Sequence, residues 1–406
     1  NASGTVAESL YGRATKAAAY ALKARVLLYA ASPLFNGNAD YAKFANEDGT
    51  LLFAPKDDSK WGKAAAAAKE AIDKIEGSSY YGLYYSDEPD NGYRNYMELF
   101  LPSKKWNKEY IFARNQGTGY SDNIHQEKCM AANGMGGWSG LCPTQELVDA
   151  YEMANGSTPI IGYNADGTPI INGASGYSET GFAATAGKHY PAGVYNMYVG
   201  REPRFYASIN FNGQQWRGRQ LEFWQGGKDG INVSKVDYCC TGYLLRKTAD
   251  EGVDVINGKG GMKEASILFR VGSLYLDYAE ALNEAEGPVD DVYKYVDAIR
   301  KRAGLPGLAK GLDKDKMRER IQHERQIELA FEAGHRYFDC HRWKIAEKTD
   351  NGYMHGMNIT ATNKVDYSKR STVGDSRVFE KKHYLFPIPQ SEMDKRIGLV
   401  QSPYWE

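Results

Sequence analysis

Two alanine-rich segments near the start of the sequence constrain its fold more than any other feature. Between residues 14 and 31, small and apolar side chains recur every three or four positions, which is the spacing of a helix that packs on two sides. Ser32-Pro33 ends this helix, because proline cannot continue it. A second helix is predicted over residues 61–75 and ends near Gly77. Because alanine lets two helices approach closely, we expect the pair to form a helical hairpin.

A similar pattern returns in the last third of the chain. Apolar residues at helical spacing predict helices over 271–282, 292–303 and roughly 313–332. Gly287-Pro288 separates the first two, and Gly304 closes the second. Helix pairs of about four turns with alanine-rich contact faces resemble tetratricopeptide units, although the full repeat consensus is absent. The sequence therefore predicts a mainly α fold with tetratricopeptide-like helical hairpins at both ends.

The stretch between the two helical ends has a different composition. From residue 117 to 261, glycine, asparagine and aromatic residues are frequent and helical periodicity is weak, which is typical of loops and short strands. We therefore divide the chain into an N-terminal helical part (1–116), a loop- and short-strand-rich insertion (117–261) and a C-terminal helical part (262–406). Because binding residues concentrate in loops held by a rigid scaffold, the insertion is the candidate ligand face.

Composition and short motifs exclude several classes of function. The 50 lysines and arginines nearly balance the 51 acidic residues, giving a formal net charge of -1, so no long-range field attracts nucleic acid. No apolar run is long enough to span a membrane. The sequence contains no C-x-x-C pair, no His-Glu-x-x-His, no Gly-x-Ser-x-Gly and no complete phosphate loop. We therefore expect no catalytic residue, no metal ion and no cofactor.

Four stretches of the sequence carry a resemblance to a known family. They are residues 11–30 (YGRATKAAAYALKARVLLYA), 143–152 (PTQELVDAYE), 201–209 (REPRFYASI) and a dense block at 324–343 (ERQIELAFEAGHRYFDCHRW), which is closed by PIPQSE and QSPY near the C-terminus. In this order and at these intervals they resemble the SusD/RagB family of outer-membrane nutrient-binding lipoproteins. The block 324–343 is specific enough to indicate the family by itself.

The resemblance implies a SusD-like fold, in which tetratricopeptide-like helices dock on a SusC-like TonB-dependent transporter. It implies a binding protein that captures an oligosaccharide at the outward-facing surface of the outer membrane and presents it for import. It also implies a lipid anchor, which this sequence lacks, and a leading helical segment ahead of Tyr11, which we expect to be missing. Relatives usually have an aliphatic residue at the position of Cys340, so we expect that side chain to pack in the core.

Three other functions stay open beside glycan binding. Some relatives bind peptides, and aromatic platforms serve both ligands. A glycoside hydrolase would need two carboxylates about 5 to 10 Å apart in an aromatic cleft. A plain helical-repeat scaffold would bind its partner on the helix face.

The charges of the block 324–343 allow a catalytic and a structural interpretation. Paired carboxylates could act as acid and base. We favour a charge network in which every charge has a partner, because burying an unpaired charge is costly and the family uses this block to build its fold. Arg336 and Asp339 are predicted members of that network. His335 has no second histidine three or four residues away, so we expect a structural histidine.

Aromatic residues of the insertion are the candidate ligand contacts. Each lies near glycines or polar turn residues, where a flat ring can face solvent and stack on a sugar. The alternative for each of them is packing in the core, because tryptophan is highly buried on average. The candidate ligand-binding residues are Trp138, Tyr163, Tyr177, Tyr190, Trp216 and Trp224.

The cysteines and one acidic segment complete the sequence-based expectations. We expect free thiols at Cys340 and at the adjacent pair Cys239-Cys240, where a vicinal disulfide is the alternative. Cys129 and Cys142 flank a glycine-rich turn. The sequence is equally compatible with a disulfide between them and with two free thiols. Residues 87–98 partly match a calcium loop, but a proline holds one ligand position, so an ordinary turn is expected.

Overall fold

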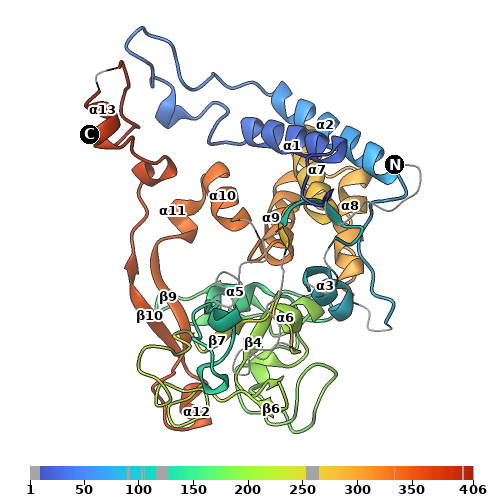
Figure 1. The fold of residues 1–406 in the computed structure, drawn as a ribbon, viewed down its shortest axis with the longest axis vertical. Helices are drawn as coiled ribbons and strands as arrows, with labels where there is room; N and C mark the ends of the chain where they lie inside the picture. The colour runs from blue at the N-terminus through green and yellow to red at the C-terminus, as the bar shows by residue number, and fades with distance from the viewer. Residues whose placement is uncertain are drawn as a thin grey trace.

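The computed structural model describes residues 10–88, 92–101, 104, 106–115, 127–252, 265–332, 334–395 and 397–405, and its ribbon is shown in Figure 1. Helices dominate its upper half, whereas loops and short strands dominate its lower half. The fold is therefore mainly α, as the sequence predicts. Among the described residues, no helix is both long enough and apolar enough to span a bilayer.

The two N-terminal helices form the predicted hairpin. They are α1 (Lys16–Ala31) and α2 (Ser59–Glu76), and α2 also packs on α7 (Val271–Glu286) from the C-terminal third. The hydroxyl of Thr15 accepts a hydrogen bond from the Ala18 backbone N–H at 3.1 Å, which caps α1. The expectation that α1 packs on two sides is wrong, because Leu22 and Val26 are 52% and 56% exposed.

The remaining predicted helices are present and share one core with the N-terminal hairpin. They are α8 (Asp290–Arg302) and α9 (Lys314–Glu328). Two short helices that the sequence did not predict follow them, α10 (His335–Arg342) and α11 (Ala346–Thr349). Apolar residues of α1, α2, α7, α8 and α9 belong to a single hydrophobic cluster. Helix α9 ends earlier than predicted, at Glu328, and the chain turns through Phe331 at a φ of 63°. The chain's two helical ends therefore form one body beside the insertion (Figure 1).

The middle of the chain consists of loops, short helices and two-stranded antiparallel pairs, as predicted. The helices are α3 (Tyr93–Phe100), α5 (Gln145–Ala150) and α6 (Pro203–Ser208). The pairs are β1 (Tyr110–Asn115) with β8 (Ala265–Arg270), β2 (Ile160–Tyr163) with β3 (Pro169–Ile171), β4 (Ile209–Phe211) with β7 (Tyr243–Leu245), and β5 (Gln215–Trp216) with β6 (Arg219–Gln220). An aromatic-rich hydrophobic cluster of its own fills this region. The boundaries of the three-part division stay a prediction.

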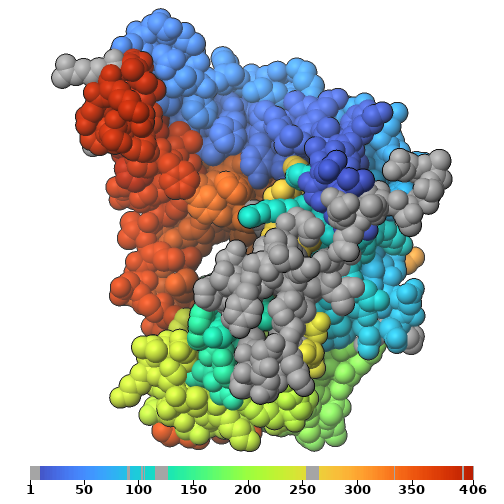
Figure 2. Space-filling model, in the orientation of Figure 1, coloured from blue at the N-terminus to red at the C-terminus, as the bar shows by residue number. Residues whose placement is uncertain are grey.

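A long C-terminal hairpin connects the helical body to the insertion. It consists of β9 (Gly352–Met357) and β10 (Arg370–Arg377), with α12 (Lys364–Tyr367) between them beside the insertion (Figure 1). The chain then ends through a 3-10 turn (Lys381–Tyr384) and α13 (Gln390–Met393). Figure 2 shows an opening beside this hairpin on the face in view. Met357, Ala361 and Tyr367 belong to the core of the insertion, so the hairpin is packed onto it.

Candidate ligand-binding site

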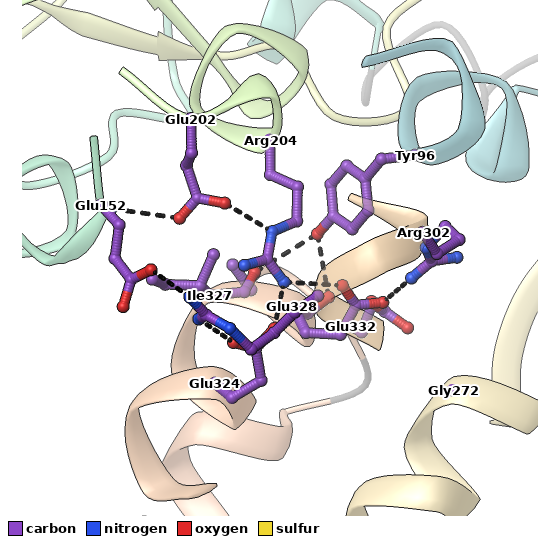
Figure 3. Close-up of polar contacts among 12 residues, drawn as sticks. Tyr96, Glu152, Glu202, Arg204, Gly272, Arg302, Glu324, Ile327, Glu328 and Glu332 are labelled. Atoms are coloured by element: carbon purple, nitrogen blue, oxygen red, sulfur yellow. Dashed lines mark hydrogen bonds and ion pairs between the residues drawn. The ribbon is translucent and has the colours of Figure 1, made fainter. Parts of the chain in front are cut away.

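Three glutamates along α9 and the turn after it are buried among guanidinium groups (Figure 3). Glu324, Glu328 and Glu332 stand four residues apart, a spacing that places helical side chains in one row. Arg204 of α6 donates to Glu324 at 2.5 Å and to Glu328 at 3.0 Å. Arg270 donates to Glu328 at 2.9 Å and to Glu332 at 2.7 Å. The row is therefore fully occupied by charge-assisted hydrogen bonds.

The same network joins the insertion to the helical body. Arg300 of α8 donates to Glu152 of the insertion at 2.9 Å, and Arg204 donates to Glu202 at 2.7 Å. Lys247 donates to the carboxylate of Glu332 at 2.7 Å and lies 2% exposed. Because the pairs Arg300–Glu152 and Lys247–Glu332 link segments far apart in sequence, the network fixes how the insertion sits on the scaffold.

A second buried cluster surrounds Asp339 of α10. Its carboxylate accepts from Nε of Arg325 at 2.9 Å and from Nε of Arg342 at 2.9 Å, and Arg325 also donates to Asp277 at 2.6 Å. The prediction that Arg336 belongs to this network is wrong. Arg336 makes no ion pair in the part of the chain that the structure describes. Its half-buried side chain lines a separate cavity of about 300 Å³.

The pKa values support a structural role for these groups. Burial by itself raises the pKa of Glu328, but Arg302, Arg270 and Arg204 outweigh burial and lower it to about 2. Burial likewise opposes ionisation of Glu332, but Arg270 and Lys247 lower its pKa to about 2. Carboxylates held ionised in this way cannot donate a proton to a leaving group. The predicted structural network is therefore confirmed for these residues.

His335 is buried beside the same clusters. Burial, with help from the nearby charges of Arg25 and Arg325, lowers its pKa to about 4. The imidazole is therefore neutral near pH 7, which fits the predicted structural histidine.

Two of the candidate aromatic residues are held by one ion-pair cluster. The hydroxyl of Tyr163 donates to Asp149 at 2.7 Å, and that of Tyr177 donates to Glu179 at 2.7 Å. Arg370 of β10 pairs with both carboxylates. Tyr163 is 48% exposed, but Tyr177 is only 6% exposed because its ring packs in the core of the insertion. The expectation that Tyr177 faces solvent is therefore wrong.

The three candidate tryptophans differ in their exposure to solvent. Trp216 is 2% exposed, so the expectation that it presents a ring to solvent is wrong; it packs in the aromatic core. Trp138 and Trp224 are half-buried, and the ammonium groups of Lys128 and Lys364 lie 5.0 Å and 5.2 Å from their ring centres. Such cation–π contacts are typical of rings that pack at a surface.

Tyr190 is the candidate aromatic residue that lines an open cavity of about 380 Å³. Tyr93, from the start of α3, stacks on His189 with ring centres 4.6 Å apart and planes 27° apart, and both line the same cavity. The amide side chains of Gln214 and Gln215 complete this wall. Rings beside amide groups offer both apolar faces and hydrogen-bonding groups, the combination that small polar ligands require.

Tyr206, Arg246 and Trp216 hold this wall in place. The ring of Tyr206 lies 5.3 Å from that of His189 and 6.1 Å from that of Tyr190, between ring centres. Arg246 donates to the hydroxyl of Tyr93 at 2.6 Å, and its guanidinium carbon lies 4.9 Å from the ring centre of Trp216. Trp216 is therefore a support for the cavity and not a part of its lining.

One polar atom in the wall is unpaired. Gln214 is 6% exposed, and its side-chain oxygen is buried without a hydrogen-bond partner. A buried acceptor left without a donor costs about 1–3 kcal/mol. A small turn of this amide toward a ligand hydroxyl would remove that cost.

Comparison with known proteins places the chain in a family. The model of the SusD family matches residues 102–405. The chain belongs to the SusD family. Two proteins of Formosa agariphila, SusD-like protein P25 and SusD-like protein P2, are 42% identical over 82 residues and 29% identical over 154 residues. These alignments cover 20% and 35% of this chain but only 15% and 26% of the two relatives.

Solved structures confirm the SusD-like fold. The protein BT4246 superposes with a TM-score of 0.77 at 28% identity, over 99% of this chain and 73% of its own. A SusD-like protein of Bacteroides fragilis, BF3747, superposes with a TM-score of 0.68 at 28% identity, over 99% of this chain and 67% of its own. This SusD-family chain therefore shares its whole architecture with longer relatives.

Sequence reasoning missed most residues of the cavity in this SusD-family chain. Tyr93 lies outside the predicted insertion, and Arg246 lies in a segment with no aromatic motif. A usable signal was the run Gly187-Lys188-His189-Tyr190-Pro191, in which two rings stand between turn-forming residues.

The sequence left a disulfide between Cys129 and Cys142 open, and the structure shows both as free thiols. All five cysteines are free, and Sγ of Cys142 lies 3.8 Å from Sγ of Cys239 instead.

The side chain of Glu98, at the end of the partial calcium-loop match, accepts hydrogen bonds from Tyr84 and Arg94.

Proposed function

We propose that this chain is the ligand-binding part of a surface nutrient-binding protein, and that the cavity beside Tyr190 binds an oligosaccharide. Family membership supports nutrient binding. The observation that carries the site is the stacked wall of Tyr93, His189 and Tyr190 next to the amides of Gln214 and Gln215. The other five candidate aromatic residues do not line this cavity.

The chemistry of sugars explains why such a wall is needed. Each sugar hydroxyl exchanges hydrogen bonds with water for hydrogen bonds with protein, at a net gain of only about 1 kcal/mol. Affinity must then come from the apolar faces of the sugar rings, which pack against aromatic side chains. Tyr190 and His189 supply such faces, and the nearby amides fix the orientation of the hydroxyls.

The partner and location follow from the family and belong to the same proposal. The bound oligosaccharide passes to a SusC-like TonB-dependent transporter at the outward-facing surface of the outer membrane. A lipid anchor holds the protein there. The shared architecture with longer SusD-like proteins supports this assignment.

The cavity favours binding over catalysis. A glycoside hydrolase needs two carboxylates flanking the scissile bond. None of the described residues that line the cavity is an aspartate or a glutamate. Peptide binding remains the alternative ligand class, because stacked rings and amides also accept peptides.

A binding screen tests the proposal. Calorimetry of the parent chain against neutral and acidic oligosaccharides and short peptides identifies the ligand class, and hydrolysis products are followed in parallel. We expect an oligosaccharide to bind without turnover, and Tyr190→Ala to weaken it at least about tenfold, or ~1.4 kcal/mol. A bound peptide, or released sugar products, would overturn the proposal.

Matched variants locate the site. Trp138→Ala and Trp224→Ala remove rings of the insertion that lie outside this cavity. We expect both to bind like the parent. If they lose affinity and Tyr190→Ala does not, the ligand surface lies elsewhere on the insertion; if none of the three changes binding, it lies on the helix face.

A further inference from the structure

The charges around the cavity narrow the class of its ligand. We propose that the cavity recognises an acidic sugar, one that carries a carboxylate or a sulfate ester, at a site built on Arg246. This inference rests on the proposed function, because it specifies which oligosaccharides the same cavity prefers.

The lining of the cavity is cationic. Arg94, Lys188 and Arg246 line it, whereas none of its described lining residues is acidic. The carboxylates that pair with the two arginines, Glu98 and Glu251, lie outside the lining. A ligand in the cavity therefore meets positive groups first, and an anionic group replaces the water that otherwise solvates them.

Neighbouring side chains hold the guanidinium group of Arg246 in a fixed position. It is 6% exposed, and its guanidinium carbon lies 4.9 Å from the ring centre of Trp216. Its two side-chain hydrogen bonds to described residues use one nitrogen: Nη2 donates to the hydroxyl of Tyr93 at 2.6 Å and to Glu251 at 2.9 Å. Nε and Nη1 donate to no described residue, which leaves N–H groups for an anion in a fixed orientation.

The partners of the two arginines do not cancel this preference. The side chain of Glu251 is 54% exposed, so its attraction for Arg246 is strongly screened by water. The carboxylate of Glu98 is shared between Arg94 and the hydroxyl of Tyr84. The side chain of Arg94 is 41% exposed and is able to swing toward a bound anion.

The geometry suggests how an acidic sugar would bind. Its ring would stack on Tyr190 and His189, while its anionic group would reach Arg246, which lines the same cavity and holds the hydroxyl of Tyr93. Binding energy from the rings is common to neutral and acidic sugars. The difference between them comes from the cations alone, so a comparison of matched ligands isolates it.

Matched probe pairs test the inference. The first pair is an oligogalacturonate and the same oligomer after its carboxylates are reduced to alcohols; the second is a sulfated galactan oligosaccharide and its desulfated form. We expect at least one acidic probe to bind about tenfold or more tightly than its neutral counterpart, and the pair that shows this preference separates carboxylate from sulfate. Raising NaCl from about 50 to about 500 mM should weaken only the acidic probe.

Variants then assign the preference to this cavity. Arg246→Gln and Arg94→Gln should each reduce the acidic preference, and Arg94→Gln covers the case in which the buried arginine is needed for folding. Arg318→Gln, a change in α9 outside this cavity, should leave the preference unchanged. Neutral oligosaccharides that bind as tightly as acidic ones, and that lose affinity in Tyr190→Ala, would overturn the inference but not the proposed function. A chain that binds no oligosaccharide at all would overturn both.

Discussion

Replacing Asp339 with alanine should destabilise the fold without touching the ligand site. Its carboxylate is 1% exposed and accepts hydrogen bonds from Arg325 and Arg342. Burial opposes ionisation, but these two guanidinium groups hold the pKa of Asp339 far below its usual range. The variant therefore leaves two buried cations with one carboxylate fewer.

The structure sets the size of the effect. Breaking a buried ion pair by removing one partner costs on the order of 3–5 kcal/mol. Arg325 keeps Asp277 at 2.6 Å and Arg342 keeps Glu280 at 2.6 Å, so the lower end of that range, about 3 kcal/mol, applies. With an unfolding entropy of about 2.1 cal/mol/K per residue over 406 residues, this lowers the melting temperature by about 3–4 °C.

Urea unfolding, followed by circular dichroism at pH 7, measures the loss in the free energy of unfolding. Calorimetry with the identified ligand measures binding affinity. Arg336→Ala is the matched control, because it removes a guanidinium from the same helix without breaking an ion pair, and it should stay within about 0.5 kcal/mol of the parent. Equal destabilisation by both variants would refute the ion-pair reasoning. If Asp339→Ala unfolds like the parent but no longer binds the ligand, the block 324–343 is a binding site instead.

Three further changes test other parts of the fold. Gly92→Ala should lower the urea midpoint, because φ is 93° and an added Cβ would lie 2.3 Å from the carbonyl oxygen of Ala303. The pKa values of Glu328 and Glu332 fall from 4.5 to about 2 on folding, so their stabilisation is complete above about pH 5 and should disappear as pH falls toward 2 in urea titrations. Trp216→Ala should cost about 3–5 kcal/mol in unfolding and also weaken ligand binding through Arg246.

The helices were predictable because their signal is local. Each predicted helix carries its own periodicity and stop residues, and α1, α2, α7 and α8 begin and end within a few residues of prediction. The early end of α9 was not predictable from periodicity, because apolar side chains continue through Phe331. The buried charges that follow Glu328 require a turn at this point, and that requirement comes from tertiary contacts.

The cavity was not predictable because its parts come from separate segments. Tyr93, Tyr190 and Gln214 lie far apart in the sequence, and no local pattern reports that they meet. The network around Glu324, Glu328 and Glu332 was predictable from the sequence only in part. The cost of burying unpaired charges in the block 324–343 indicated a network. The identity of the partners, such as Arg204 and Arg270, depends on the packing of the insertion against the helical body.

Nearby glycines and polar turn residues were an unreliable guide to which rings face solvent. Trp216 lies in such a segment, between Gln214-Gln215 and Gly218, yet the ring is buried. Its turn brings the chain back on itself through β5 and β6, which closes the ring against the core. The ring then fixes the guanidinium of Arg246, and Arg246 in turn fixes the hydroxyl of Tyr93. A buried tryptophan therefore acts on the ligand through the cation it supports, so a loss of affinity in Trp216→Ala would be expected even though no ligand touches that ring.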